Sequence, residues 1–318
     1  MENLYLPEGA LSSTAENSEY LSSLSGLEKA MQIGKILEAP VLLCDNQFRL
    51  HVDLGGIDGI IEKDDVVYSP TGEPSKDIAV ITRVGKPVCF KITSIEQKGG
   101  RAVARLSRRE AQRECTEKFI SRLCLGDILP AKVTHLENFG AFVDIGCGIV
   151  SLLSIDCLSV SRISHPRDRL NVGMNVHVVV KLIDRENHRV FVSMRELLGT
   201  WEQNAARFEV GQTVAGIVRS VEPYGIFIEL TPNLAGLAEL KTDIDAPPPE
   251  HLIGQYTAVY IKSIIPERMK VKLVLVDSYH SDIRKMPIKY YVDTSACTHI
   301  DYWRYSPECS AKLIETVF

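Results

Sequence analysis

One stretch of the chain decides its fold, and it is Asn138-Phe139-Gly140-Ala141-Phe142-Val143-Asp144-Ile145. Its second half, with branched apolar side chains at alternate positions, is typical of a short β-strand. The pattern recurs downstream as Pro223-Tyr224-Gly225-Ile226-Phe227-Ile228-Glu229-Leu230 and, in a weaker copy upstream, as Gln47-Phe48-Arg49-Leu50-His51-Val52-Asp53-Leu54. The three repeated units start 92 and 85 residues apart, which indicates tandem domains rather than a solenoid. The short strands and glycine turns of each unit predict a small closed barrel of five strands.

The sequence around these units predicts an all-β chain with short connecting helices. Helix starts are indicated by Ser107-x-x-Glu110 and Ser193-x-x-Glu196, which have the capping-box pattern. The serine-rich start of the chain carries a net charge of −4 over 33 residues and predicts a flexible lead-in. The predicted segments are a lead-in with a short helix (1–33), a degenerate barrel (34–109), a helical linker (110–125), a barrel (126–196), a second helical linker (197–210), a further barrel (211–278) and a non-repeat aromatic C-terminal tail (279–318).

Composition excludes several classes of protein. The 318 residues are 45% hydrophobic and 24% charged, which is ordinary for a globular chain. The sequence contains no run of about 18 apolar residues, the length that a membrane-spanning helix needs. The eight cysteines show no Cys-x-x-Cys spacing, and the chain starts without a signal segment, so we expect a cytoplasmic protein with reduced thiols and no zinc knuckle. Motifs of nucleotide hydrolases, metalloproteases and serine hydrolases are missing. We therefore expect no enzyme, no catalytic residues, no cofactor, no metal, no small-molecule substrate and no membrane partner.

Further motifs follow the deciding stretch in a fixed order. They are Arg162-x-x-His165-Pro166, Val172-Gly173-Met174-Asn175-Val176 and a closing Arg189-Val190-Phe191-Val192-Ser193. In this order the motifs resemble the S1 RNA-binding domain, an OB-fold module. The resemblance implies a five-stranded S1-type barrel that binds single-stranded RNA on one face.

The resemblance is specific over residues 126–196, good over 211–276 and partial over 34–109, about two thirds of the chain in all. A tandem array led by a degraded copy resembles a short member of the bacterial ribosomal protein S1 family. This implies an RNA-binding protein of bacterial translation, with single-stranded RNA, in particular mRNA, as its partner and the small ribosomal subunit as a further candidate. The C-terminal tail matches no module.

The middle unit carries a pair of aromatic residues suited to RNA. A sequence-tolerant binder of single strands needs rings on which bases stack and cations along the backbone. Phe139 and Phe142 are three residues apart, which on an ideal strand puts them on opposite faces. The glycine between them permits a kink that brings both rings to one surface. The residues alone also allow one or both rings to lie in the core, whereas the resemblance implies that both are stacking platforms.

The other two units differ at these positions. Tyr224 and Phe227 stand there in the last unit, again with a glycine between them. The first unit has Phe48 and His51, with Arg49 in place of the glycine. We expect Phe48 and His51 to be weaker contacts, because arginine lacks the backbone freedom of glycine, and the first barrel either to bind RNA poorly or to serve as a docking surface.

Polar residues complete the expected RNA face. The family places a histidine, an aspartate and an arginine beside the rings. In the middle unit Asp184 and Arg189 match, while Ser154 stands at the histidine position and can hydrogen-bond to a phosphate but not stack. In the last unit Lys270 takes the arginine position, and Glu239, at the histidine position, would repel phosphate.

The cations beside the expected path of the RNA are Lys132, Arg162, Arg167 and Lys181. Any one of them could equally be a solvated surface charge. His165, which precedes a proline, either faces RNA or forms part of a structural turn.

The charge distribution leaves a second hypothesis open. Residues 34–109, 126–196 and 211–278 have net charges of +2, 0 and −2, so no barrel is strongly basic. We expect modest binding dominated by stacking, with a shallow salt dependence. The alternative is a protein-interaction or regulatory scaffold whose barrels have largely lost RNA binding.

Overall fold

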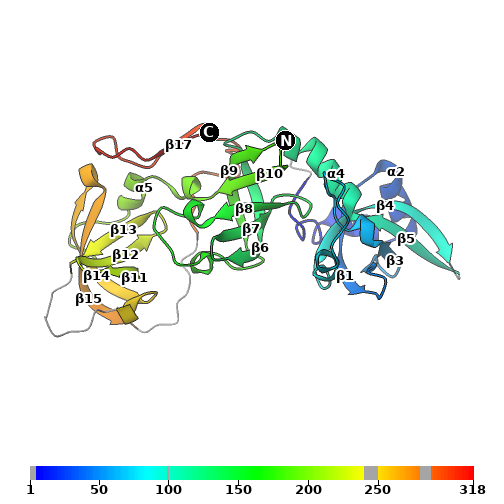
Figure 1. Ribbon diagram of the computed structural model, residues 1–318, viewed down its shortest axis with the longest axis horizontal. Coiled ribbons are helices and arrows are strands. Elements are labelled where there is room, and N and C mark those ends of the chain that lie inside the picture. Colours follow the sequence, from blue (N-terminus) through cyan, green and yellow to red (C-terminus); the bar gives the residue numbers. More distant parts are fainter. Residues whose placement is uncertain (1–4, 99, 240–249, 280–287) are drawn as a thin grey trace. The chain divides into compact units, whose positions relative to one another are not determined.

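The computed structural model describes residues 5–98, 100–239, 250–279 and 288–318 (Figure 1). Parts of the expected lead-in (1–4), last barrel (240–249) and C-terminal tail (280–287) lie outside the described residues. The described chain forms three closed barrels of five strands each. The predicted all-β class, with tandem OB-type barrels and few short helices, is confirmed.

The first barrel has its strands in the spatial order β1-β2-β3-β5-β4. Its strands are β1 (Leu37–Cys44), β2 (Leu50–Asp53), β3 (Asp58–Ile61), β4 (Pro87–Lys98) and β5 (Arg101–Ser107). The helices beside them are α1 (Ala15–Leu21), α2 (Leu24–Ile33), η1 (Lys63–Asp65), α3 (Asp77–Ile81), α4 (Arg108–Lys118) and η2 (Ile120–Arg122). Leu27, Leu50 and Phe90 are fully buried in its core.

The middle and last barrels repeat this strand order. The middle barrel consists of β6 (Ile128–Glu137), β7 (Gly140–Asp144), β8 (Val150–Ser154), β9 (Asn175–Asp184) and β10 (Arg189–Ser193), with η3 (Ile155–Cys157) and η4 (Pro166–Asp168). The last barrel consists of β11 (Thr213–Glu222), β12 (Gly225–Thr231), β13 (Leu234–Ala238), β14 (Tyr256–Ile265) and β15 (Lys270–Tyr279), with η6 (Glu250–Leu252) and η7 (Pro266–Arg268). In all three barrels the third strand pairs in parallel with the fifth.

The alternation of side chains along β7 and β12 places Phe142 and Phe227 on the outer faces of their barrels. In β7, Ala141 and Val143 are fully buried while Phe142 between them is half-exposed. In β12, Ile226 and Ile228 are buried while Phe227 is half-exposed. Because successive side chains on a strand point to opposite faces, the core residues fix the phenylalanines on the outer faces of their barrels.

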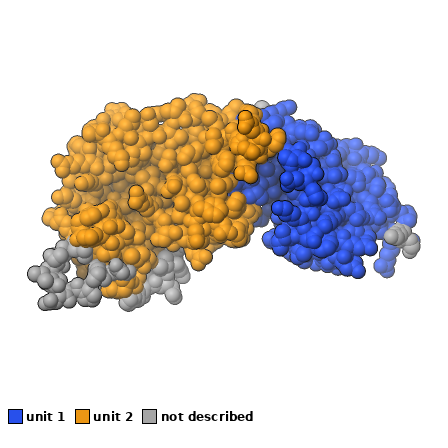
Figure 2. All heavy atoms as spheres, viewed as in Figure 1, with its two compact units in different colours: residues 1–123, 130–132, 143–151 blue, residues 124–129, 133–142, 152–318 orange. Residues whose placement is uncertain are grey.

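Contacts divide the chain into two compact units (Figure 2). Unit 1 contains residues 1–123 together with 130–132 and 143–151. Unit 2 contains residues 124–129, 133–142 and 152–318. The aromatic pairs of the middle and last barrels both belong to unit 2.

The expected flexible lead-in is corrected for the residues that the structure describes. Tyr5, Glu8 and Asn17 are each less than one tenth exposed. The Asn17 side chain exchanges hydrogen bonds with the backbone of Glu38, donating to its carbonyl at 2.8 Å and accepting from its N–H at 2.9 Å. Polar side chains of the lead-in therefore form hydrogen bonds with buried polar groups of the barrel and are not solvated. The composition of this segment predicted flexibility because it carries no information about these partners.

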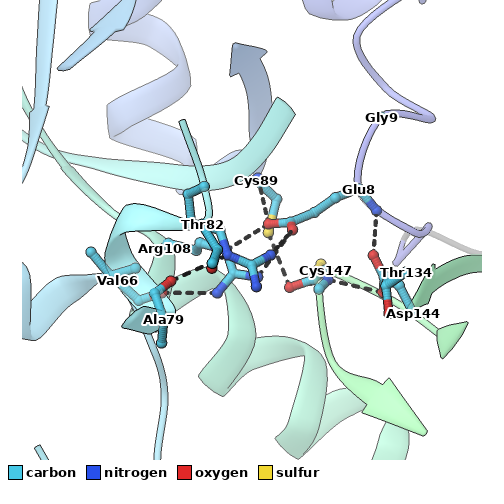
Figure 3. Close-up of polar contacts among 12 residues, drawn as sticks. Glu8, Gly9, Val66, Ala79, Thr82, Cys89, Arg108, Thr134, Asp144 and Cys147 are labelled. Carbon is cyan, nitrogen blue, oxygen red and sulfur yellow. Dashed lines mark hydrogen bonds and ion pairs between the residues drawn. The ribbon is translucent and has the colours of Figure 1, made fainter. Parts of the chain in front are cut away.

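Unit 1 contains a buried ion pair between Arg108 and Glu8 (Figure 3). Arg108, at the start of α4, donates from Nε and Nη2 to the two carboxylate oxygens of Glu8 at 2.6 and 3.0 Å, and from Nη1 to the Val66 carbonyl at 2.8 Å. The backbone N–H of Cys89 also donates to Glu8, at 3.1 Å. The backbone N–H of Glu8 itself donates to the carboxylate of Asp144 at 2.7 Å. Residues far apart in the sequence are thus joined by one hydrogen-bonded network.

The same network shifts the acidity of its two carboxyl groups. Burial raises the pKa of Glu8, but the charge and hydrogen bonds of Arg108 outweigh it, and the net shift is downward. Burial and the neighbouring Glu8 carboxylate raise the pKa of Asp144 to about 7, against the hydrogen bonds it accepts from backbone N–H groups. One acidic group is therefore held ionised and its neighbour is held protonated up to near-neutral pH.

Replacing Asp144 with asparagine is expected to reduce the pH dependence of stability. A carboxyl with a folded pKa of about 7 and an unfolded pKa of about 3.9 keeps a proton in the folded state that the unfolded state has released, so stability falls as the pH rises between these values. The lowered pKa of Glu8 acts only at more acidic pH. Urea unfolding of the native chain and D144N at about pH 5 and about pH 8 measures the effect. An equal loss of stability in both proteins would contradict it.

The first predicted helix start is confirmed in part. Ser107 Oγ accepts a hydrogen bond from the Glu110 backbone N–H at 3.0 Å and caps α4. The Glu110 carboxylate does not complete the reciprocal box and instead accepts from Arg113 at 2.7 Å.

The second predicted helix start is wrong, because the capped helix begins seven residues later, at Thr200. The Ser193 hydroxyl donates to the Glu196 carboxylate, but η5 (Arg195–Leu198) has no side-chain cap. Gly199, with φ of +85°, ends this short helix. A reciprocal capping box between Thr200 and Gln203 then starts α5 (Trp201–Ala205), because the left-handed glycine separates the two helical turns.

The aromatic C-terminal segment packs on the last barrel. It forms a hairpin of β16 (Tyr302–Arg304) and β17 (Glu315–Val317). Trp303 and Tyr305 are 7% and 5% exposed and belong to the core of the last barrel. The Tyr305 hydroxyl donates to the Asn233 carbonyl at 2.6 Å. These rings are core residues of unit 2.

Candidate nucleic-acid interface

The middle barrel presents two aromatic rings side by side. Phe139 lies in the turn between β6 and β7 and is 55% exposed, and Phe142 follows on β7. Their ring centroids are 6.0 Å apart with an interplanar angle of 88°. Phe139 precedes the strand, so the alternation of strand faces does not separate it from Phe142.

Gly140 makes this arrangement possible. A Cβ at this position would lie 2.5 Å from the Leu153 carbonyl oxygen and 2.9 Å from Cα of Ser154. The backbone of the ring pair therefore touches the end of β8, which brings Ser154 beside the rings. The Ile155 N–H donates to the Phe139 carbonyl at 2.9 Å and fixes the turn.

The last barrel repeats the geometry. Tyr224 is 63% exposed and its ring centroid lies 6.1 Å from that of Phe227, with the planes at 90°. Gly225 has φ of +154°, and a Cβ there would lie 2.7 Å from the Ala238 carbonyl oxygen. Two barrels thus hold an exposed ring and a half-exposed ring in the same way, by the same close approach of backbones.

The first barrel lacks such a pair. Phe48 has φ of +59°, packs against the barrel core and has the Lys63 ammonium 5.0 Å from its ring centroid. His51 lies between two carboxylates, with Nε2 3.4 Å from Asp45 and Nδ1 3.3 Å from Asp58. His51 is therefore flanked by acidic groups, one of which, Asp45, is also paired with Arg49 at 2.7 Å.

Changing the ring positions of the first barrel is expected to leave RNA affinity within about twofold, because neither side chain is free to stack. The variant is Phe48→Leu with His51→Ala, in which leucine retains the packing of Phe48 on the core. Fluorescence anisotropy with a labelled single-stranded RNA measures the affinity. A loss comparable to that caused by changing Phe139 and Phe142 would show that the first barrel binds RNA.

Two of the predicted polar residues lie at the β9–β10 turn. Asp184 and Arg189 are paired in register across it. Hydrogen bonds from the Asn187 side chain and backbone lower the pKa of Asp184 and keep it ionised. The Arg189 side chain is exposed. Asp184 therefore stabilises the turn, and Arg189 is the member of the pair that is accessible to an anion.

Other predicted contacts are engaged by the fold. Lys132 belongs to unit 1, where its ammonium donates to the Glu8 carbonyl at 2.9 Å. His165 Nδ1 accepts from the backbone N–H of Arg167 at 3.0 Å and caps η4, so this histidine forms part of a structural turn. The Lys181 ammonium lies 3.1 Å from Cys157 Sγ.

In the last barrel, Lys270 and Glu239 are both exposed. Sequence reasoning missed Arg219, on β11 beside the last ring pair. Arg162, expected beside the path of the RNA, lines a pocket with Tyr224 of the last barrel. Nothing in the spacing of the motif indicates which barrel the loop faces.

The described part of the chain offers rings and guanidinium groups rather than a metal centre. No group of three or more His, Cys, Asp or Glu side chains in it is arranged to hold a metal ion. None of its helices is long and apolar enough to cross a membrane.

Comparison with known proteins identifies the class. Residues 123–195 match the family model described as the S1 RNA binding domain. With the strand order of the middle barrel, this match identifies residues 123–195 as an S1 domain of the OB-fold class.

Curated proteins that are similar to this chain over a longer stretch are named small ribosomal subunit protein bS1. The protein of Rhizobium meliloti is 28% identical over 71% of this chain and 39% of its own length, and that of Coxiella burnetii is 28% identical over 81% of this chain and 47% of its own length. The bS1 homolog of Bacillus subtilis is 32% identical over 49% of this chain and 42% of its own length. The chain therefore spans less than half the length of these relatives.

Two solved structures are similar to parts of this chain. GSP13 from Bacillus subtilis is 28% identical and covers 23% of this chain and 57% of its own, with a TM-score of 0.22. A multidomain protein with nucleic acid binding domains from Streptococcus pneumoniae is 13% identical and covers 79% of this chain and 76% of its own, with a TM-score of 0.24.

Proposed function

We propose that the chain binds single-stranded RNA and that the ring pair of the middle barrel is its main contact. The observation that carries the proposal is the pairing of Phe139 and Phe142, 6.0 Å apart, with 55% of Phe139 exposed. Rings placed in this way receive unstacked bases, at about 1–3 kcal/mol per base. Ser154 beside the rings and the exposed Arg189 supply polar contacts to the sugar-phosphate backbone.

The charge of the middle unit makes base stacking the main source of its affinity for RNA. Residues 126–196 carry no net charge, so few phosphates are neutralised on binding and the salt dependence is shallow. The test is anisotropy with a labelled single strand of about 12 nucleotides and a duplex of the same composition. Preference for the single strand, with a loss of about tenfold or less between about 50 and about 200 mM salt, agrees with the proposal. Equal affinity for the duplex, or a thousandfold loss with salt, would refute it.

We infer that the RNA is messenger RNA and that the chain acts in bacterial translation in the cytoplasm, at the small ribosomal subunit. What supports this is the similarity to proteins named small ribosomal subunit protein bS1. Crosslinking and sequencing of bound RNA, with sedimentation of ribosomal subunits, tests the inference. Recovery of coding transcripts and co-sedimentation with the small subunit are expected. RNA binding without either would leave the RNA contact standing and remove the ribosomal role.

A docking role is a second candidate for the first barrel alone. The observation that favours it is the pair of carboxylates around His51, at the position where the other barrels expose a ring. Stoichiometric co-purification of a protein with the full chain, lost when His51 and Asp58 are both replaced with alanine, would support it.

A further inference from the structure

A pocket of about 600 Å³ opens beside the ring pair of the last barrel. One wall consists of Tyr224 and Phe227 together with β11. The opposite wall is the loop of residues 160–164, which belongs to the middle barrel. All of these residues lie in unit 2. Pockets of this volume hold small molecules of nucleotide size.

Buried hydrogen bonds hold the loop against the last barrel. The Val160 N–H donates to the Asn233 side chain and the Ser161 N–H to the Pro232 carbonyl, both at 3.0 Å. Arg169, after the loop, donates from Nη2 to the Glu229 carboxylate of β12 at 2.6 Å, and both side chains are at most 5% exposed. The pocket wall is therefore preorganised and does not need to order when a ligand binds.

Arg162 and Arg219 both line the pocket and differ in their ion pairs. Arg219 donates to Glu229 at 2.8 Å and lies 3.6 Å from Asp168, so its charge is neutralised by the fold. Arg162 is exposed on the pocket wall, and among the residues that the structure describes it has no hydrogen-bond or ion-pair partner. Among the described residues that line the pocket, Glu222 is the one carboxylate. A planar guanidinium opposite exposed rings fits a phosphate that is bonded to a stacked nucleoside.

We propose that the middle and last barrels share one nucleotide subsite, in which Arg162 from the loop of the middle barrel binds the phosphate of a nucleotide whose base stacks on Tyr224 and Phe227. The subsite rests on the proposed binding of single-stranded RNA and extends it to a second position on unit 2. It also accounts for the phosphate contact of the last barrel, where Glu239 stands in place of a polar donor. The cation is supplied by the neighbouring barrel.

The test is a double-mutant cycle read by anisotropy with labelled single-stranded RNA. We expect R162Q to weaken binding about three- to tenfold. The slope of log Kd against log salt concentration should fall by roughly the amount that one phosphate contact contributes. In a Y224A/F227A background the same change should have almost no further effect, because both groups hold one nucleotide. R207Q is the matched control, since Arg207 is an exposed arginine of unit 2 that does not line the pocket.

The outcomes separate this subsite from the main site. Loss of binding in F139A/F142A, with R162Q equal to the native chain, would refute the shared subsite and leave the proposed function intact. If R162Q causes the same loss of RNA affinity in the Y224A/F227A background as in the native chain, Arg162 contacts RNA elsewhere. This result would also refute the shared subsite. Loss in R162Q and Y224A/F227A with none in F139A/F142A would support the subsite and remove the main contact from the middle barrel. No RNA binding by the intact chain would refute both.

Discussion

Replacing Phe139 and Phe142 with alanine is expected to weaken the binding of single-stranded RNA by at least about tenfold. One stacked base contributes about 1–3 kcal/mol, and each 1.4 kcal/mol corresponds to about tenfold in Kd. Phe139 is 55% exposed, so the change removes a platform and not a core residue. The loss should persist at high salt, because stacking does not depend on released counterions.

A matched control is Val172→Ala on the same barrel. Val172 is a 62% exposed apolar residue in the loop before β9, and we expect its removal to leave the Kd unchanged. Circular dichroism and the melting temperature establish that F139A/F142A remains folded. If the folded variant binds RNA as tightly as the native chain, the rings are not the site.

Arg108→Met is expected to destabilise unit 1 by about 3 kcal/mol, because it leaves the buried Glu8 carboxylate with Arg83, 3.6 Å away, in place of the hydrogen-bonded guanidinium of Arg108. Arg108 is 2% exposed and Glu8 is 7% exposed, so water cannot replace the guanidinium. The melting temperature of unit 1 should fall by roughly 10 °C. Thermal unfolding followed by circular dichroism measures the shift.

Arg113→Met on the same helix is the control for Arg108→Met. Arg113 pairs with Glu110 and Glu117 at the surface, with its side chain 45% exposed, and exposed pairs contribute about 0–1 kcal/mol. Adding Glu8→Gln to Arg108→Met should recover part of the stability, since it removes a buried charge that would have Arg83 but not Arg108 beside it. Similar unfolding curves for the Arg108 and Arg113 variants would contradict the assigned role of the buried pair.

The barrels and the positions of the rings could be predicted because they follow from local sequence. Gly140 and Gly225 admit the backbone of a neighbouring strand within about van der Waals contact, and each lies between two aromatic residues. The recurrence of this arrangement in two units identified both the fold and the candidate surfaces. Whether the rings were core or surface required the structure, because Phe139 lies in a turn and not on the strand.

The contacts over long sequence distances could not be predicted. Glu8 is one of several acidic residues in a polar segment, and only folding brings it to Arg108, 100 residues away. The same holds for Arg162, whose loop packs on the following barrel. Lys132 was expected beside RNA but is engaged by the Glu8 carbonyl. An isolated charge in a sequence carries no information about its partner, and the partner decides between a structural and a binding role.

The pairing of Arg169 with Glu229 has a consequence for dissecting the array. Cutting the chain within residues 197–210 would separate these partners and leave Glu229, 0% exposed, with Arg219 as its remaining cation. The last barrel cut out in this way would also lack the wall formed by residues 160–164. A fragment that preserves the native surroundings of the last barrel therefore begins ahead of the middle barrel. Studies of the last barrel should use a fragment that contains both the middle and the last barrel.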